Sequence, residues 1–316
     1  MKKSTKTLEF NTFAQMLEVL NTEAKCREYL EEIIWEGEPV CPHCGSKSKK
    51  HYELTKNGEF KGLYKCKDCR KRFTITVKTM FEGSHIPLRK WFIAVYIFNS
   101  HKKGISSVQL SKDLGLTQKT AWYMLNRIRN TFSNKSIKKS SGTFQVDESF
   151  FAGKNKNRHE NKKVKESQGR SLKDKTPVFG LLKNDNEVFI SVVPNTKAKT
   201  LKPIIEKMVE KGSIIISDEW KVYNGLSKDF SHIVINHKEN KYSKNGFSNN
   251  GIENFWSMMK RGIYGVYHQA SPKHLHRYCD EFAHRYNTRE MKDNDRFKMS
   301  LKNSENQLSY KELITK

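Results

Sequence analysis

The sequence has few acidic residues for its size, and long apolar runs are missing from it. Its 316 residues contain 34 Asp and Glu against 59 Lys and Arg, a formal charge of +25. No apolar run reaches the about 18 residues that a membrane-spanning helix needs, so we expect no membrane partner. The first residues, Met1 to Lys6, lead into no apolar segment of the kind a secretory signal contains. We therefore expect a cytoplasmic protein.

Apolar residues are also scarce, at 36% of the chain, but the aromatic ones among them are not. Eighteen Phe, 12 Tyr and 5 Trp supply the large apolar surfaces that a disordered chain lacks. The length allows two or three folded domains of about 100 to 200 residues each. The excess of basic residues predicts a polyanionic partner, and we favour nucleic acid over acidic lipid because neither end carries a strongly amphipathic basic helix.

Only six cysteines are present, and four of them form two Cys-x-x-Cys knuckles, at Cys41 and Cys44 and at Cys66 and Cys69. Two such knuckles close a tetrahedral site for one structural Zn²⁺, and the metal replaces a core that is too small to fold alone. Disulfides are the alternative, which a cytoplasmic location disfavours. We predict a helical segment over 1–36 and a zinc ribbon over 37–80.

The sequence contains two further cysteines, and one histidine lies beside the knuckle cysteines. Cys26 and Cys279 lie in apolar helical patterns and are expected in the core. His43 lies inside a knuckle and could be a ligand, although four cysteines already complete the shell.

The segment 85–132 has a helical pattern throughout. A helix ends at Gly115, and Thr117 is placed to cap the next one, whose apolar side carries Ala121, Met124, Leu125 and Ile128. A helix, a glycine turn and a polar-faced helix make a helix-turn-helix, in which the last helix enters the major groove of DNA. A plain three-helix bundle is the alternative. The side chains predicted to face outward are Gln118, Lys119, Tyr123, Arg127 and Arg129.

A second domain is predicted over 142–290, followed by a polar tail over 291–316. Its pattern predicts three antiparallel strands, an amphipathic helix and a buried strand, and then two late helices. Asp147 lies on the first strand and Asp218 ends the buried strand, where open α/β sheets place their chemistry. Glu148 and Glu219 follow these acids directly, but adjacent residues on a strand face opposite sides, so only one of each pair can enter a common site.

Glu253 and Lys260 lie two turns apart on one side of a predicted helix, whose other side carries Phe255, Met258 and Met259. Alone, such a pair is an ordinary solvated helix face. After two strands that carry Asp147 and Asp218, the same pair becomes a candidate for a shared cleft.

With these acids in this order, the chain resembles bacterial insertion-sequence transposases of the DDE class that carry an N-terminal zinc ribbon, the ISXO2-like transposase family. The resemblance extends from the first knuckle to about residue 290. Asn254 departs from the family pattern, which has a small residue such as Gly there. The most specific pieces are Val146-Asp147-Glu148-Ser149, Ser217-Asp218-Glu219, Ile252-Glu253-Asn254-Phe255-Trp256-Ser257-Met258-Met259-Lys260-Arg261-Gly262 and Tyr267-His268-Gln269-Ala270-Ser271-Pro272-Lys273-His274-Leu275.

The resemblance implies an α+β multidomain protein: a zinc ribbon and a helix-turn-helix, then an α/β ribonuclease H-like, DDE integrase-type core with a mixed sheet. It implies that Asp147, Asp218 and Glu253 hold two Mg²⁺ (or Mn²⁺) ions for DNA cleavage and strand transfer, with Lys260 as the basic residue of the site. Carboxylate oxygens are the ligands that these hard ions demand. His237 and His268 lie near these motifs, but a lone histidine is more often an ordinary surface or core residue.

The partners implied are double-stranded DNA, as terminal inverted repeats and target, and further copies of the chain in a synaptic complex. Bound to DNA, the protein would associate with the nucleoid. The side chains predicted to contact DNA are Gln118, Lys119, Tyr123, Arg127, Lys260 and Arg261. Two alternatives stay open: a zinc-ribbon and helix-turn-helix regulator without catalysis, and a related metal-dependent nuclease that hydrolyses but never joins strands.

Overall fold

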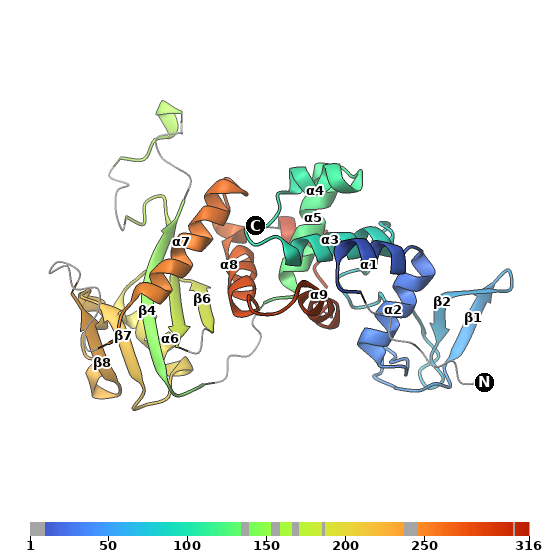
Figure 1. Cartoon of the computed structure of the whole chain (residues 1–316), viewed down its shortest axis with the longest axis horizontal. Helices are drawn as coiled ribbons and strands as arrows, with labels where there is room; N and C mark the ends of the chain where they lie inside the picture. Colours follow the sequence, from blue (N-terminus) through green and yellow to red (C-terminus); the bar gives the residue numbers. More distant parts are fainter. Residues whose placement is uncertain are drawn as a thin grey trace. The chain divides into compact units, whose positions relative to one another are not determined.

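A computed structural model describes residues 10–133, 139–152, 159–165, 171–184, 187–236, 246–305 and 307–315. The chain divides into two compact units, one of Met1–Phe132 with Met291–Lys316 and the other of Ser133–Glu290 (Figure 1). Within the described ranges, no helix is both long and apolar enough to cross a bilayer.

The unit of Ser133–Glu290 is built on a five-stranded mixed sheet with the strand order β6-β5-β4-β7-β8. The first three strands of this unit, β4, β5 and β6, pair antiparallel. β7 then pairs in parallel with β4, and β8 pairs in parallel with β7. This is the strand order of a ribonuclease H-like core, as predicted. The strands are β4 (Thr143–Phe151), β5 (Thr176–Lys183), β6 (Val188–Val192), β7 (Ile214–Asp218) and β8 (Ser231–Ile235).

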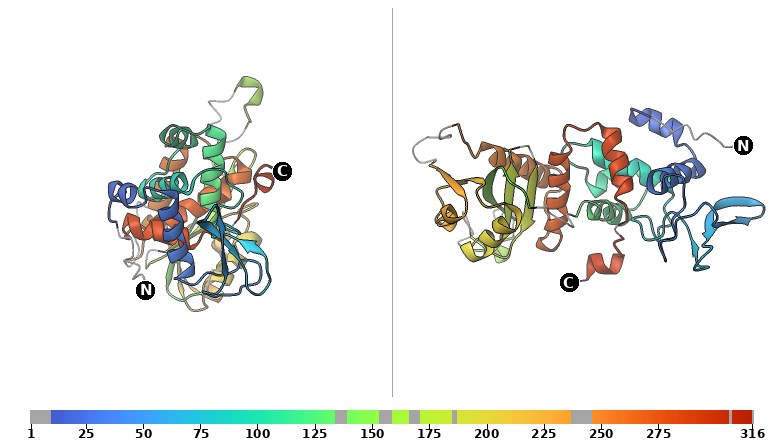
Figure 2. Two further views of the ribbon diagram at one scale, coloured as in Figure 1. Left: turned by 90° about the vertical axis from the view of Figure 1, so that its right-hand side faces the viewer. Right: turned by 90° about the horizontal axis from the view of Figure 1, so that it is seen from below.

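Both faces of this sheet are covered (Figures 1 and 2), because alternate residues of each strand are apolar on opposite sides. Phe151 of β4 packs with α7 (Asn250–Gly265) and α8 (Pro272–Asn287), where Pro272 occupies the first turn. Phe144 and Val146 of β4 pack on the other face with α6 (Ala198–Met208). Two short 3-10 turns on that side are η3 (Lys221–Tyr223) and η4 (Leu226–Lys228), and η2 (Glu160–Lys162) precedes β5.

Two glycines allow α7 to approach the sheet closely. Gly180 of β5 pairs with Asp147 of β4, and a methyl group there would overlap the Trp256 indole and lie 3.1 Å from Cδ1 of Ile252. A methyl group at Gly251 would lie 2.8 Å from both Oε1 of Gln145 and Cδ2 of Leu182. Oε1 of Gln145 accepts a 2.9 Å hydrogen bond from the Ile252 backbone N–H, which ties the first turn of α7 to β4. The helix that carries Glu253 is therefore held at a fixed place above β4.

The other unit begins with two short helices and the cysteine ribbon. Thr12 caps α1 (Phe13–Val19) and Thr22 caps α2 (Glu23–Trp35), each by accepting a backbone N–H bond three residues on. The ribbon follows with three antiparallel strands: β1 (Tyr52–Lys56), β2 (Glu59–Lys65) and β3 (Arg72–Phe73).

The helices that follow the ribbon are α3 (Leu88–Ser100), α4 (Ser107–Leu114) and α5 (Gln118–Asn130). Gly115 ends α4 in the left-handed conformation, and Thr117 caps α5, as the sequence predicted. This is a helix-turn-helix arrangement.

The C-terminal segment contains two helices that the sequence did not predict, α9 (Asp293–Lys302) and α10 (Tyr310–Ile314). Phe297 and Leu301 of α9 are fully buried in the same core as Phe10, Tyr29 and Phe92. Asn99 of α3 and Ser300 of α9 also bond to each other through their side chains, at 2.9 Å. Although its composition is polar, α9 is thus a structural part of the N-terminal unit.

Two arginines of α5 do not face outward as predicted. Arg127 and Arg129 are 3% and 1% exposed. Arg127 donates to the Glu82 backbone carbonyl at 2.6 Å and lies over the rings of Trp91 and Tyr123, while Arg129 lies over Phe98. Their long aliphatic stems and flat guanidinium groups allow burial against aromatic rings, which an apolar-polar pattern does not reveal.

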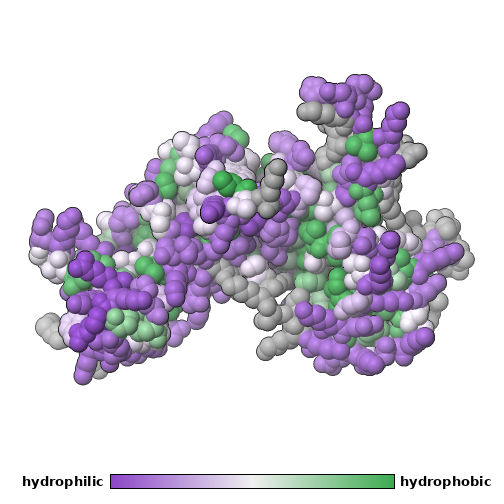
Figure 3. Space-filling model, turned by 180° about the vertical axis from the view of Figure 1, so that it is seen from behind, coloured by the Kyte–Doolittle hydropathy of each residue, from purple (hydrophilic) through white to green (hydrophobic). Residues whose placement is uncertain are grey.

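Hydrophilic residues dominate the side of the molecule in Figure 3, with apolar residues in scattered patches. This surface matches the composition, in which charged residues make up 29% of the chain.

The Gly180 contact gives a direct test of how α7 is placed. Gly180→Ala should lower the free energy of unfolding of the sheet unit by about 1 to 3 kcal/mol, because the added methyl group overpacks the Trp256 contact. Gly265→Ala is the matched control, since a methyl group at that end of α7 meets no neighbour within 4 Å. Urea unfolding monitored by circular dichroism measures both, and equal stability of the two variants would contradict the close approach.

Candidate active site and metal centre

Asp147, Glu253 and Lys260 line one hollow of about 630 Å³ at the β4 and α7 surface. Gln145 points to α7, so Asp147, two residues further along β4, faces the same side of the sheet. Glu253 and Lys260 reach the hollow because they lie two turns apart on the outer side of α7, while Phe255 and Met259 are fully buried beneath. The remaining lining residues are Glu148, Ser149, Trp256, Ser257, Arg261 and Tyr264.

Asp218 ends β7, the parallel neighbour of β4, and is not among the residues that line the hollow. The register pairs Gln145 with Ile216. This is the last pair between the two strands. Continued two residues beyond it, the same register would set Asp218 beside Asp147 on the same face, at the strand spacing of about 4.8 Å. Oδ1 of Asp218 accepts the Trp220 backbone N–H at 3.1 Å, which fixes the carboxylate at the strand end.

The two neighbouring acids have different surroundings. Glu148 points to the opposite side of β4 from Asp147, where its carboxylate accepts a hydrogen bond from the Tyr223 hydroxyl, although part of Glu148 also reaches the hollow. Glu219 is exposed. Strand alternation directs the two side chains to opposite sides of β4. The prediction that only one of them can enter the site is nevertheless wrong, because Glu148 also lines the hollow.

Tyr223 is a residue of this region that the sequence analysis missed. It is 1% exposed, and burial, followed by the charges of Glu148, Asp147 and Asp218, raises its pKa well above its usual value. The hydroxyl therefore stays protonated and donates to Glu148. The only signal in the sequence was its place shortly after Asp218, which does not distinguish it from any other aromatic core residue.

The histidines near the motifs do not join the hollow where the structure describes them. His268 is exposed, in the left-handed conformation at φ 60°, and is not among the lining residues. His237 lies outside the described residues.

The predicted DNA-contacting side chains of α5 divide by exposure. Gln118 and Lys119 are exposed, and Tyr123 is half-buried with its hydroxyl donating to the Leu308 carbonyl at 2.8 Å. Arg127 is buried, so its predicted exposure to DNA is wrong. On α7, Arg261 is exposed and donates to the Ser257 hydroxyl at 2.7 Å.

The four knuckle cysteines form a metal site. Their sulfur atoms all lie within 4.8 Å of one another, with Cys41 and Cys69 at 3.6 Å and Cys44 and Cys66 at 3.7 Å. Four thiolates bound about 2.3 Å from a tetrahedral zinc lie about 3.8 Å apart, so the donor set and its spacing fit Zn²⁺. His43 is not part of the cluster, and its Nε2 lies 3.1 Å from the Arg72 carbonyl oxygen.

Both knuckles have the same backbone geometry. The N–H of Gly45 bonds back to the Cys41 carbonyl, and the N–H of Arg70 bonds back to the Cys66 carbonyl. Gly45 and Arg70 are both left-handed, with φ of 75° and 62°. These tight turns point both sulfurs of each knuckle to one centre.

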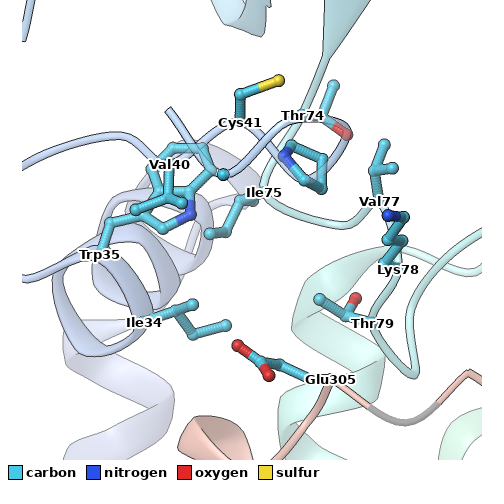
Figure 4. A pocket seen from close by; sticks show the side chains of 12 residues that line it. Ile34, Trp35, Val40, Cys41, Thr74, Ile75, Val77, Lys78, Thr79 and Glu305 are labelled. Carbon is cyan, nitrogen blue, oxygen red and sulfur yellow. The ribbon is translucent and has the colours of Figure 1, made fainter. Parts of the chain in front are cut away.

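A second hollow, of about 330 Å³, lies beside the ribbon (Figure 4). Ile34, Val40 and Ile75 contribute apolar walls, and Glu305 points its carboxylate inward. The Cys41 sulfur points away from this space, so the hollow is separate from the thiolate cluster.

Comparison with known proteins agrees with this combination of a ribonuclease H-like sheet unit and a four-cysteine ribbon. Residues 139–287 match the ISXO2-like transposase domain, and residues 21–72 match the transposase zinc-ribbon domain. The chain belongs to the ISXO2-like transposase family.

Individual relatives give the same result. An "Uncharacterized transposase-like protein" of Haemophilus influenzae is 36% identical over 107 residues, which cover 34% of this chain and 85% of that protein. An "Uncharacterized protein in transposable element ISH50" of Halobacterium salinarum is 32% identical over 103 residues, which span 32% of this chain and 33% of that protein.

Among solved structures, the "Crystal structure of a pre-cleavage Mos1 transpososome" aligns with 63% of this chain and 74% of that chain. The sequences are 12% identical and the TM-score is 0.25.

The thiolate cluster predicts that the purified protein contains one zinc ion per chain. Cys66→Ser should lose that zinc and unfold the ribbon, because three thiolates leave the tetrahedral shell incomplete. Cys279→Ala, at a buried position outside the cluster, should keep its zinc. Atomic absorption measures the metal content, and full zinc occupancy in Cys66→Ser would contradict the assignment.

Proposed function

We propose that this protein is a DNA transposase that cleaves and joins DNA strands by metal-assisted phosphoryl transfer. The observation that supports it most is the common hollow of Asp147, Glu253 and Lys260, with Asp218 beside Asp147 by strand register. Membership in a transposase family gives this chemistry its DNA substrate.

The donor set fits a hard divalent cation. Carboxylates on β4, at the end of β7 and on α7 offer oxygen ligands from three rigid elements, and Asp147, Asp218 and Glu253 would hold Mg²⁺ or Mn²⁺, as a pair of ions. Bound there, such ions would lower the pKa of an attacking hydroxyl group and would stabilise the negative charge on the leaving oxygen.

The chain's own residues orient the DNA. Lys260, half-buried at the edge of the hollow, neutralises a phosphate next to the reacting bond, and Arg261 adds a second positive charge on the same helix.

The reaction has two steps. Water first attacks the phosphodiester at the end of the element and releases a 3′-hydroxyl. That hydroxyl then attacks a target phosphodiester, so each bond broken is matched by one formed.

Recognition of the duplex is assigned to the helix-turn-helix. Gln118 and Lys119 lie at the start of α5, the end that reaches base edges in this motif, and Tyr123 lies one turn further. A second copy of the chain would hold the other end of the element in the synaptic complex.

Paired substitutions test the catalytic assignment. Asp218→Asn should lower Mg²⁺-dependent cleavage of duplexes that carry the element's ends by at least about a thousandfold, because loss of an anionic ligand removes several kcal/mol of transition-state stabilisation. Glu219→Gln changes the adjacent, exposed acid in the same way and should keep most activity. Both variants should bind the duplex as the unmodified protein does.

Two outcomes would favour the alternatives. Cleavage that survives in Asp218→Asn would remove this residue from the site, whereas duplex binding without any cleavage by the unmodified protein would leave a DNA-binding regulator as the better account. Cleavage without joining, in a strand-transfer assay that starts from pre-nicked ends, would identify a nuclease instead.

A further inference from the structure

The outer face of α5 is partly covered by the chain's own C-terminal segment. The Tyr123 hydroxyl donates to the Leu308 carbonyl at 2.8 Å, and the Tyr310 ring meets the Tyr123 ring edge-on, with centroids 5.4 Å apart and planes at 85°. The Lys119 ammonium lies 5.0 Å from the centre of the Tyr310 ring, within cation–π range. Two of the three α5 side chains that we assign to DNA, Lys119 and Tyr123, are therefore engaged by residues 308–310.

The segment that makes these contacts is a formed element with its own anchors. Ser309 and Glu312 complete a capping box at the start of α10, and Leu313 is fully buried. Leu308, just before the helix, is 5% exposed. These anchors hold Tyr310 against α5.

The cover is nevertheless small. α10 has five residues, and isolated helices shorter than about 12 residues are marginal in water, so its structure depends on its contact with the rest of the unit. Exposed cation–π and aromatic edge contacts contribute only about 1 kcal/mol each. Such a segment can be displaced by a partner that offers Lys119 and Tyr123 stronger contacts.

We propose that α10 occupies the DNA-binding face of α5 and must leave it before α5 enters a major groove. The groove is about 12 Å wide and a helix with its side chains about 10 to 12 Å, so a second helix on the contact face does not fit. Lys119 cannot lie over Tyr310 and neutralise a phosphate at the same time. This inference rests on the proposed function, because it requires that α5 binds DNA.

As a consequence, the chain lowers its own affinity for DNA while α10 covers α5. The observed Kd equals the intrinsic Kd divided by the fraction of molecules in which the face is open. A duplex with the correct sequence displaces α10, whereas weak, non-specific contacts leave it in place.

The substitution Tyr310→Ala removes both ring contacts and leaves Ser309 and Glu312 in place. We expect it to bind a fluorescently labelled duplex, cut from the DNA that flanks the coding sequence, with an about tenfold lower Kd, because the open fraction rises. Ile314→Ala is the matched control on the same helix, since Ile314 is 51% exposed, and should leave the Kd unchanged. A gain of affinity is informative because a damaged fold would lower affinity.

Hydrogen exchange on the unmodified protein tests the same inference without a substitution. The Leu313 amide bonds to the Ser309 carbonyl at 3.1 Å, so its exchange reports whether α10 is formed. Adding the duplex should slow exchange in α5 and speed it in α10.

The outcomes distinguish this inference from the proposed function on which it rests. If the unmodified chain binds the duplex but Tyr310→Ala binds it equally or more weakly, or if α10 becomes more protected with DNA, α10 is no competitor and the proposed function still stands. If neither chain binds the duplex, α5 is not a DNA-binding helix and both proposals fail.

Discussion

The close contact between α7 and the sheet is the constraint on which the candidate active site depends. Gly180 leaves room for the Trp256 indole, Gly251 brings the first turn of α7 against Gln145 and Leu182, and the Gln145 amide oxygen holds the Ile252 N–H. With α7 held there, Glu253 and Lys260 meet Asp147 in one hollow. A helix displaced by a single methyl group would separate the carboxylates that we propose to share Mg²⁺ ions, whose ligands lie at about 2.1 Å.

The ribbon of the N-terminal unit depends on another source of stability, because it has too few apolar residues to fold by burial alone. The thiolate cluster supplies that stability, and the aromatic rings of Trp35, Tyr64 and Phe73 connect the ribbon to α2 through edge and stacked contacts. The same core continues through Phe92 to Phe297 of α9. Residues 291–316 thus belong to the same unit as residues 1–132.

Local patterns were sufficient to predict much of this architecture. The knuckles predicted the cysteine cluster, Gly115 and Thr117 predicted the helix-turn-helix, and strand alternation predicted the ribonuclease H-like sheet and the opposite directions of Asp147 and Glu148. These features depend on neighbours in sequence, so the pattern contains them.

Other features depend on contacts between distant segments, which no local pattern records. α9 carries only Phe297 and Leu301 as fully buried apolar side chains, too few to indicate a helix, and its burial depends on α3. Arg127 is charged and therefore predicted to be exposed, but Glu82, Trp91 and Tyr123 bury it. Tyr223 bonds to Glu148, and Tyr310 packs against α5; both partners are far away in the sequence.

The central claim is that Asp147, Asp218 and Glu253 hold divalent metal together. A crystal of the protein with Mn²⁺, measured at an X-ray energy where manganese scatters anomalously, locates the ion directly. The account predicts an anomalous peak within about 2.1 to 2.3 Å of carboxylate oxygens from β4, β7 and α7. A peak coordinated by Glu148 or Glu219 in place of Asp147 or Asp218, or no peak in the hollow at saturating Mn²⁺, would contradict it.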